Sequence, residues 1–169
     1  MASDFRLPTD RRTLVAEGMR FASHPKIMGI INATDDSFFE GSRMMDSEAV
    51  QKGIAMWEAG ATWVDVGGES TRPGAEPVDE ATELQRVIPV IEGLREARPD
   101  GLISIDTRHA SVARQALKAG ADMVNDVSGL RDPEMVEVVL EAGCAVCVMH
   151  MQGEPGTMQA KPSYVDVNE

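Results

Sequence analysis

Three segments of the chain repeat one order of elements: a helical pattern, a glycine, and then a short apolar run rich in β-branched residues. The three glycines are Gly60, Gly120 and Gly143. A glycine in this position supplies the left-handed conformation that ends a helix. The runs that follow are nearly continuously apolar, which is typical of strands buried on both faces of a parallel sheet. The repeat therefore predicts strand–helix units joined by right-handed crossovers, and so a parallel α/β fold.

The same pattern extends along the rest of the chain and predicts five strands with helices between them. We expect strands near residues 27–32, 62–67, 102–106, 123–127 and 145–150. Start signals of the Ser, Asp and Pro type predict the helices, because these side chains cap the first turn or fit into it. The predicted helices are one capped by Ser47, one that opens at Asp79 and is kinked at Pro89, one over Ser111–Lys118, and one capped by Asp132 with Val136, Val139 and Leu140 inside.

Composition excludes several classes of protein. The 169 residues are enough for one domain, and 28 acidic against 16 basic residues give a net charge of −12, which disfavours nucleic acid as a partner. No apolar run approaches the roughly 18 residues that span a bilayer, and the first residues lack the apolar segment of a secretory signal. The only cysteines, Cys144 and Cys147, are too few for a disulfide framework, and we expect them to pack in the core. We therefore expect a cytoplasmic protein with no membrane partner.

Polar side chains stand at the end of every predicted strand. They are Asn32, Asp65, Asp106, Asn125 with Asp126, and His150. One or two of these residues would be ordinary helix caps or turn formers. Because parallel α/β folds build their sites at the carboxyl ends of the strands, the full set predicts a common site at one edge of the sheet.

The number of units leaves two architectures open. A complete (β/α)₈ barrel needs eight units and about 250 residues. Five units in 169 residues predict either an open, flavodoxin-like sheet or one part of a barrel.

Two long segments and three short ones resemble the signatures of the dihydropteroate synthase family. The long segments are residues 28–38 and 65–74, and the short ones are 103–107, 125–127 and 148–153. The resemblance implies a pterin-binding (β/α)₈ TIM barrel, of which residues 27–169 form about the first five units, with residues 1–26 as an N-terminal lead-in. It also implies a transferase of folate biosynthesis, which joins 6-hydroxymethyl-7,8-dihydropterin diphosphate to p-aminobenzoate and releases diphosphate.

The resemblance assigns roles to six residues of this sequence. A carboxylate suits the paired donors of a pterin edge, an amide oxygen is a hard ligand for Mg²⁺, and a guanidinium suits an anion. The implied contacts are Asp106, Asn125 and Met149 for the pterin, Thr71 and Arg72 for the substrates and their phosphates, and Asn32 for Mg²⁺.

The chain also departs from the family pattern. Asp35 stands where the family usually has proline, and Phe39 stands in a usually glycine-rich first loop. Later family motifs, which include Asp-Pro-Gly and Ser-Arg-Lys, do not occur in this sequence. We therefore expect a C-terminally truncated chain that is inactive alone and forms a homodimer only when complete. A pterin-binding methyltransferase domain and a non-catalytic pterin-binding fragment stay as alternatives.

Overall fold

The fold is built on one parallel sheet of five strands, which a computed structural model describes for residues 6–20, 25–33, 42–69 and 77–166. The strands are β1 (Met28–Asn32), β2 (Trp63–Gly67), β3 (Leu102–Asp106), β4 (Met123–Asp126) and β5 (Ala145–Val148). They lie side by side in the order β1-β2-β3-β4-β5. A doubly wound sheet reverses its strand order part-way, whereas a barrel wall runs in sequence order. The open flavodoxin-like alternative is therefore wrong, and the barrel prediction is the one that fits.

Five helices accompany the sheet in the described part of the chain. They are α1 (Thr9–Met19), α2 (Ser42–Glu58), α3 (Glu80–Ala97), α4 (Ala110–Ala119) and α5 (Met135–Ala142). The strand predictions are correct to within two residues at each end, and β3 matches at both ends. The sequence patterns did not predict α1, because only Val15 and Gly18 of this helix are buried.

The helix starts agree with the sequence only in part. Asp79 caps α3, since its carboxylate accepts from the backbone N–H of Thr82 at 2.9 Å. Ser47 is not a cap, because α2 already begins at Ser42. The carboxylate of Asp132 serves two helix starts: Oδ1 accepts from the N–H of Glu134 at 3.0 Å, just before α5, and Oδ2 accepts from the N–H of Ala110, the first residue of α4, at 2.8 Å. The N-cap position of α5 itself is Glu134.

The predicted apolar face of the last helix was right at Val139 and wrong at the other two residues. Val136 is 44% exposed and Leu140 is 73% exposed, whereas Val138 and Val139 are buried. The buried stripe lies about one position away from the predicted one, because α5 starts only at Met135 and is set by its contact with α4.

Alternate residues of each strand point to opposite faces of the sheet. The outer face is the one covered by helices, with α2 against β1 and β2 and α3 against β2 and β3. Its side chains form the main core, in which Val64, Val66, Ile103, Ile105 and Val124 are fully buried. This apolar layer holds the strands in register and leaves the other face, the inner face, free to carry polar groups.

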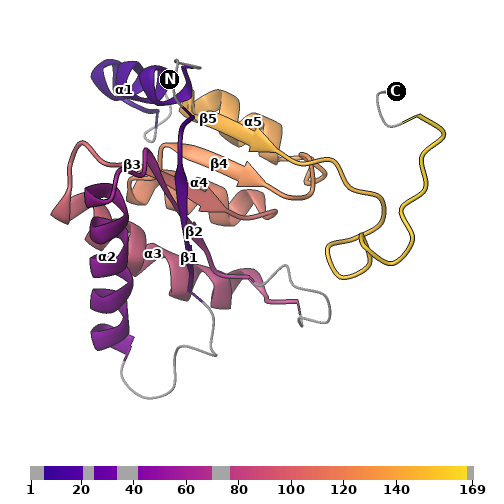
Figure 1. The fold of residues 1–169 in the computed structure, drawn as a ribbon, viewed down its shortest axis with the longest axis horizontal. Coiled ribbons are helices and arrows are strands. Elements are labelled where there is room, and N and C mark those ends of the chain that lie inside the picture. The colour runs from indigo at the N-terminus through magenta and orange to yellow at the C-terminus, as the bar shows by residue number, and fades with distance from the viewer. Residues whose placement is uncertain (1–5, 21–24, 34–41, 70–76, 167–169) are drawn as a thin grey trace.

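Helix α1 covers the inner face at the end of the sheet where the strands begin. Trp63, Leu102 and Met123 lie there in a second cluster with Leu7 and Val15 from the N-terminal segment. Figure 1 shows α1 at the end of the sheet where the strands begin, while the segment after β5 runs past their carboxyl ends.

Charged hydrogen bonds fix α1 in this position. Arg11 binds the buried carboxylate of Asp122 with both Nε and Nη2 at 2.5 Å, and Arg95 of α3 binds the same carboxylate at 2.7 Å. The N-terminal ends of the strands are thereby tied to two helices, and the carboxyl ends stay free for a site.

The cysteines differ from the core packing that we expected. Cys144 is half-buried and contacts both clusters, and burial raises the pKa of its thiol to about 11. Cys147 is exposed, because β5 is the last strand of the sheet and no described helix covers that part of it. Among the residues that the structure describes, no helix combines the length and apolar character needed to cross a membrane.

Candidate active site

A single row of residues crosses the inner face at the carboxyl ends of the strands. The register pairs Asn32 with Gly67, Gly67 with Asp106, Asp106 with Asn125, and Asn125 with Cys147. Three of the residues predicted for the common site are therefore neighbours in space although they lie up to 93 positions apart in the chain. In-register parallel pairing puts the three on one face, as their strand-end positions predicted.

Asp106 is the carboxylate at the centre of this row. It is half-buried and makes no hydrogen bond or ion pair with any described residue. Its pKa is raised to about 7, first by burial and then by the charges of Asp65, Glu83, Glu69 and Asp126. A carboxylate whose pKa is raised in this way, and which has no partner among the described residues, is typical of a ligand-binding position.

Gly67 makes room for that carboxylate. A Cβ at this position would lie 3.4 Å from both Cβ and Oδ2 of Asp106. A larger side chain would therefore compete with any ligand for the space above Asp106. This contribution was not visible in the sequence, where Gly67 belongs to an ordinary Gly-Gly pair.

Asp65, which lies one layer nearer the starts of the strands, holds the side chain of Asn125. The Nδ2 of Asn125 donates to Oδ2 of Asp65 at 3.0 Å, across the intervening strand β3. Asp65 is only 2% exposed, so burial raises its pKa, and the Ser104 hydroxyl and the Asn125 amide partly oppose that rise. Asp65 thus lies one layer below the row and does not form part of it, which corrects its prediction as a strand-end site residue.

An Arg–Glu ion pair and a His–Glu contact border the row on the side of α3 and α4. Arg108 donates to both oxygens of Glu69, at 2.8 and 3.1 Å, and Nδ1 of His109 lies 2.8 Å from Oε2 of the buried Glu83. Burial acts to raise the pKa of Glu69, but the hydrogen bonds and charge of Arg108 outweigh it and lower that pKa. For Glu83, burial prevails and the pKa is raised despite His109. The site is therefore strongly acidic, and its acids are fixed in place.

The comparison with known proteins covers nearly the whole described fold. The family model described as "Pterin binding enzyme" matches residues 28–169, which include all five strands and the whole row. The chain belongs to the pterin-binding enzyme family.

Individual members of this family are close in sequence and structure. The chain is 49% identical over 146 residues to the dihydropteroate synthase of Escherichia coli K12, which covers 86% of this chain and 51% of that protein. It superposes with a TM-score of 0.74 and 44% identity on a Xanthomonas albilineans dihydropteroate synthase with 4-aminobenzoic acid, covering 86% and 51% of the two chains. A Burkholderia cenocepacia dihydropteroate synthase complexed with 7,8-dihydropteroate superposes with a TM-score of 0.69 and 44% identity. This match covers 86% of this chain and 48% of that chain.

These comparisons confirm the resemblance and the fold class. The five-stranded sheet is the first part of a (β/α)₈ barrel of the pterin-binding family, in sequence order. The chain spans about half the length of the curated relatives that it matches. The domain bounds 1–26 and 27–169 stay a prediction; the family match itself begins at Met28.

Asn32 is the residue predicted to bind Mg²⁺. It is exposed at the end of β1, and its side chain makes no hydrogen bond with another described residue. An unpaired amide oxygen beside the acidic row fits a hard cation that takes its other ligands from water and phosphate. In the described ranges, no group of three or more His, Cys, Asp or Glu side chains is placed to hold a metal ion.

The remaining predicted residues differ in how far the structure describes them. Thr71 and Arg72, as well as Asp35 and Phe39, lie outside the described residues. Met149 is 38% exposed just beyond β5, and its carbonyl oxygen lies 2.9 Å from where a Cβ of Gly129 would be, with Gly129 at φ +71°. Only glycine fits both the left-handed conformation and this close approach.

Two strand-end residues have structural roles. The carboxylate of Asp126 accepts from the N–H groups of Ser128 and Leu130 at 2.7 and 2.8 Å, which fixes the turn after β4. His150 lies beyond the end of β5, exposed, with its ring centroid 5.6 Å from that of Tyr164. Neither belongs to the row, so the prediction of one common site was too broad.

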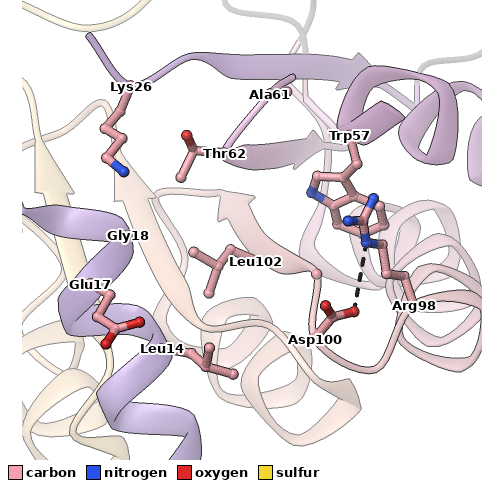
Figure 2. Close-up of a pocket in the computed structure, with 11 residues that line it drawn as sticks. Leu14, Glu17, Gly18, Lys26, Trp57, Ala61, Thr62, Arg98, Asp100 and Leu102 are labelled. Carbon is pink, nitrogen blue, oxygen red and sulfur yellow. Dashed lines mark ion pairs between the residues drawn. The ribbon is translucent and has the colours of Figure 1, made fainter. Parts of the chain in front are cut away.

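A separate hollow of about 240 Å³ lies at the opposite end of the sheet (Figure 2). Its lining includes Lys26, Thr62 and Leu102 at or just before the starts of strands, with Leu14 from α1. The Arg98 guanidinium lies 5.6 Å from the centroid of the Trp57 ring and pairs with Asp100 at 3.6 Å. This hollow contains no residue of the row and is no part of the candidate active site.

Proposed function

We propose that this chain supplies the pterin-binding part of a dihydropteroate synthase. The reaction condenses 6-hydroxymethyl-7,8-dihydropterin diphosphate with p-aminobenzoate and gives 7,8-dihydropteroate and diphosphate. One observation carries the proposal: Asp106, half-buried and without a partner among the described residues, lies in register beside Asn125 at the carboxyl ends of a barrel wall. The names of the relatives support this assignment.

Asp106 and Asn125 recognise the pterin in this proposal. The ionised carboxylate of Asp106 accepts two N–H donors from one edge of the ring, as a carboxylate does from an amidine. Asn125 can both donate and accept on the same edge. Met149, at the rim beside this pair, would contact the ring face.

The reaction itself is a substitution at the exocyclic methylene of the pterin. The C–O bond to diphosphate breaks and takes its electron pair with the leaving group, the amine nitrogen of p-aminobenzoate forms the new C–N bond, and the nitrogen then loses a proton. The ring delocalises the positive charge that develops at the methylene carbon. Asp65, Glu69, Glu83 and Asp126 raise the pKa of Asp106 by their negative charge, and the same charges stabilise a cationic ring.

Asn32 and Arg72 would act at the diphosphate. Asn32 offers an amide oxygen to Mg²⁺, and the bound cation would neutralise charge on the leaving group. Arg72 would supply a guanidinium to the same anion, and Thr71 a hydroxyl. The net charge of −12 makes such local positive charge necessary, because the surface as a whole repels a diphosphate. A cytoplasmic location and a homodimer stay predictions that rest on composition and on the resemblance.

Calorimetry with 6-hydroxymethyl-7,8-dihydropterin diphosphate tests the proposal on the 169-residue chain. We expect binding, and we expect Asp106→Ala to weaken it about 30-fold or more, as for a lost charge-assisted pair. Asp100→Ala is the matched control, since it removes the same charge at the other end of β3, where Asp100 pairs only with Arg98 among the described residues. Equal affinity of the parent and Asp106→Ala would refute the assignment.

A second titration tests the metal assignment. Asn32→Ala should raise the Mg²⁺ concentration needed for diphosphate binding and leave the affinity for the diphosphate-free pterin unchanged. Identical Mg²⁺ dependence of the parent and the variant would refute this role.

A further inference from the structure

The recognition chemistry of Asn125 depends on which way its side-chain amide faces. An asparagine amide offers one acceptor oxygen and two N–H donors, and its two ends have nearly the same shape. A rotation by half a turn exchanges them and changes which ligand edge can bind. A residue that recognises a heterocycle therefore needs a neighbour that fixes its orientation.

Asp65 is the one described residue that binds this amide. Its Oδ2 accepts from Nδ2 of Asn125 at 3.0 Å, from a position only 2% exposed in the layer below the row. An ionised carboxylate has no proton to donate, so it can pair only with the N–H end of the amide. The oxygen of Asn125 is neither fully buried nor hydrogen-bonded to another described group, so it stays available to a ligand.

Two groups beside Asp65 favour its ionised form. Burial raises the pKa of Asp65, whereas the hydroxyl of Ser104, its register partner on β3, and the Asn125 amide both oppose that rise. The ionised carboxylate only accepts hydrogen bonds, so it is the form that fixes the amide with an N–H toward Asp65.

We propose that Asp65 is a positioning residue of the pterin site, which acts by turning the Asn125 amide so that its oxygen and its second N–H face the ligand. One acceptor and one donor then lie side by side, which matches an amino group next to an unprotonated ring nitrogen. The ligand in this statement rests on the proposed function, whereas the orientation of the amide rests on the contacts alone.

Two variants of Asp65 separate positioning from charge. Asp65→Leu removes the acceptor and has a similar shape, whereas Asp65→Asn removes the same charge but keeps an oxygen that can face Asn125. Measured at pH 8.5, where Asp106 is ionised, Asp65→Leu should weaken the affinity for 6-hydroxymethyl-7,8-dihydropterin diphosphate about tenfold, and Asp65→Asn by less than about threefold. Asp100→Leu is the matched control, because it makes the same substitution at an exposed aspartate outside the row, which pairs only with Arg98 among the described residues, and it should leave the affinity unchanged.

A double-mutant cycle gives the decisive comparison. If Asp65 acts through Asn125, then Asp65→Leu should have no further effect on affinity in an Asn125→Ala chain. An equal loss in both backgrounds, or an equal loss for Asp65→Leu and Asp65→Asn, would overturn the positioning role.

The side-chain amide signals of Asn125 test the orientation without any ligand. In the ¹⁵N spectrum of the parent chain, one Asn125 amide proton should be shifted downfield and protected from exchange, and both properties should be lost in Asp65→Leu and kept in Asp100→Leu. Unchanged signals in Asp65→Leu would overturn the inference. Failure of the parent to bind the pterin would overturn the proposed function instead, and the amide signals would still decide the orientation.

Discussion

The two faces of the sheet differ although neighbouring residues of the same strands form them. On the outer face, Val64, Val66, Ile103 and Ile105 are fully buried under helices. On the inner face, the residues next to them in sequence include Asp65, Ser104 and Asp106. Because strand side chains alternate with a period of two, stability and recognition are assigned to different residues of one strand. A change on one face can therefore leave the other almost intact.

The two faces also differ in the polar groups that they bury. The outer face of β2 and β3 buries apolar side chains, whereas the inner face buries Asp65 and Ser104. Oδ1 of Asp65 and Oγ of Ser104 have no hydrogen bond of normal geometry in the described structure, and neither has Nε1 of Trp57 in the main core. Each such buried group costs stability. The polar pair beneath the row is therefore a cost that the binding face carries.

The largest expected effect comes from the outer face. Ile105→Ala should lower the free energy of unfolding by about 3 kcal/mol, because it leaves a cavity in a fully buried core. Ser104→Ala, one residue earlier on the inner face, should change it by less than about 1 kcal/mol, since its hydroxyl makes no hydrogen bond of full geometry and acts only weakly on Asp65. Urea unfolding measures both values. Similar losses for the two variants would contradict the idea that the outer face supplies stability and the inner face supplies binding.

Removing the central charge of the inner face should stabilise the chain. Burial and neighbouring acids raise the pKa of Asp106 from 3.8 to about 7, so the folded chain holds a proton that the unfolded chain has released. Stability therefore falls as the pH rises through this window, and Asp106→Asn, which resembles the protonated acid, avoids that loss. We expect the variant to be more stable by about 2 kcal/mol at pH 8 and no more stable below about pH 4. A constant difference between parent and variant across this range would show that the ionisation of Asp106 does not matter.

The ionisation of Asp106 should also govern binding. If the ring edge binds the ionised carboxylate, the affinity for 6-hydroxymethyl-7,8-dihydropterin should fall about tenfold for each pH unit below about 7 and stay constant above it. This compound is a better probe than its diphosphate, because it carries no phosphate groups that would titrate in the same pH range. Asp65→Asn should move the midpoint of the profile to lower pH, since Asp65 is the strongest of the neighbouring charges on Asp106. A flat profile between pH 5.5 and 8 would argue against Asp106 as the pterin contact.

The smallest expected effect concerns the first strand, where the two faces can be compared in adjacent residues. Ile30 on the inner face is 59% exposed, whereas Ile31 on the outer face is 5% exposed. Ile30→Thr should change the free energy of unfolding by less than about 0.5 kcal/mol, but it should reduce self-association, because apolar end strands pair with other chains. Light scattering over a range of concentrations measures the association. Ile31→Thr should instead destabilise the fold, and an unchanged scattering curve for Ile30→Thr would exclude this residue as a cause of association.

Much of the fold could be predicted from the sequence because its signals are local. The repeated helix–glycine–strand order and the apolar runs predicted all five strands to within two residues, and Asp79 was correctly predicted as a cap. The missed features depend on distant contacts. Helix α1 is held by Arg11, whose Nη1 donates to the carbonyl of Pro99 at 3.0 Å, 88 positions away, and no local pattern announces such a bond.

The candidate site shows the same limit. The strand-end rule correctly selected Asn32, Asp106 and Asn125 as one group, but it also selected Asp126, which fixes a turn. It placed Asp65 in the row instead of below it, and it gave no sign of Glu83, which looks like any acid in the first turn of a helix. Whether a carboxylate faces a ligand, a turn or another side chain depends on its three-dimensional surroundings.

The sequence by itself determined the order of strands and helices, the family, and the residue types at the carboxyl ends of the strands, because periodicity and motifs are written into neighbouring residues. Only the tertiary structure decided that Asp106 titrates near 7 and that Asp65 binds Asn125 from 60 positions away. Both properties arise when groups remote in the chain are brought within a few ångströms of one another and shielded from water. In such surroundings, desolvation and the fields of neighbouring charges change the pKa and the hydrogen bonding that each side chain has in water.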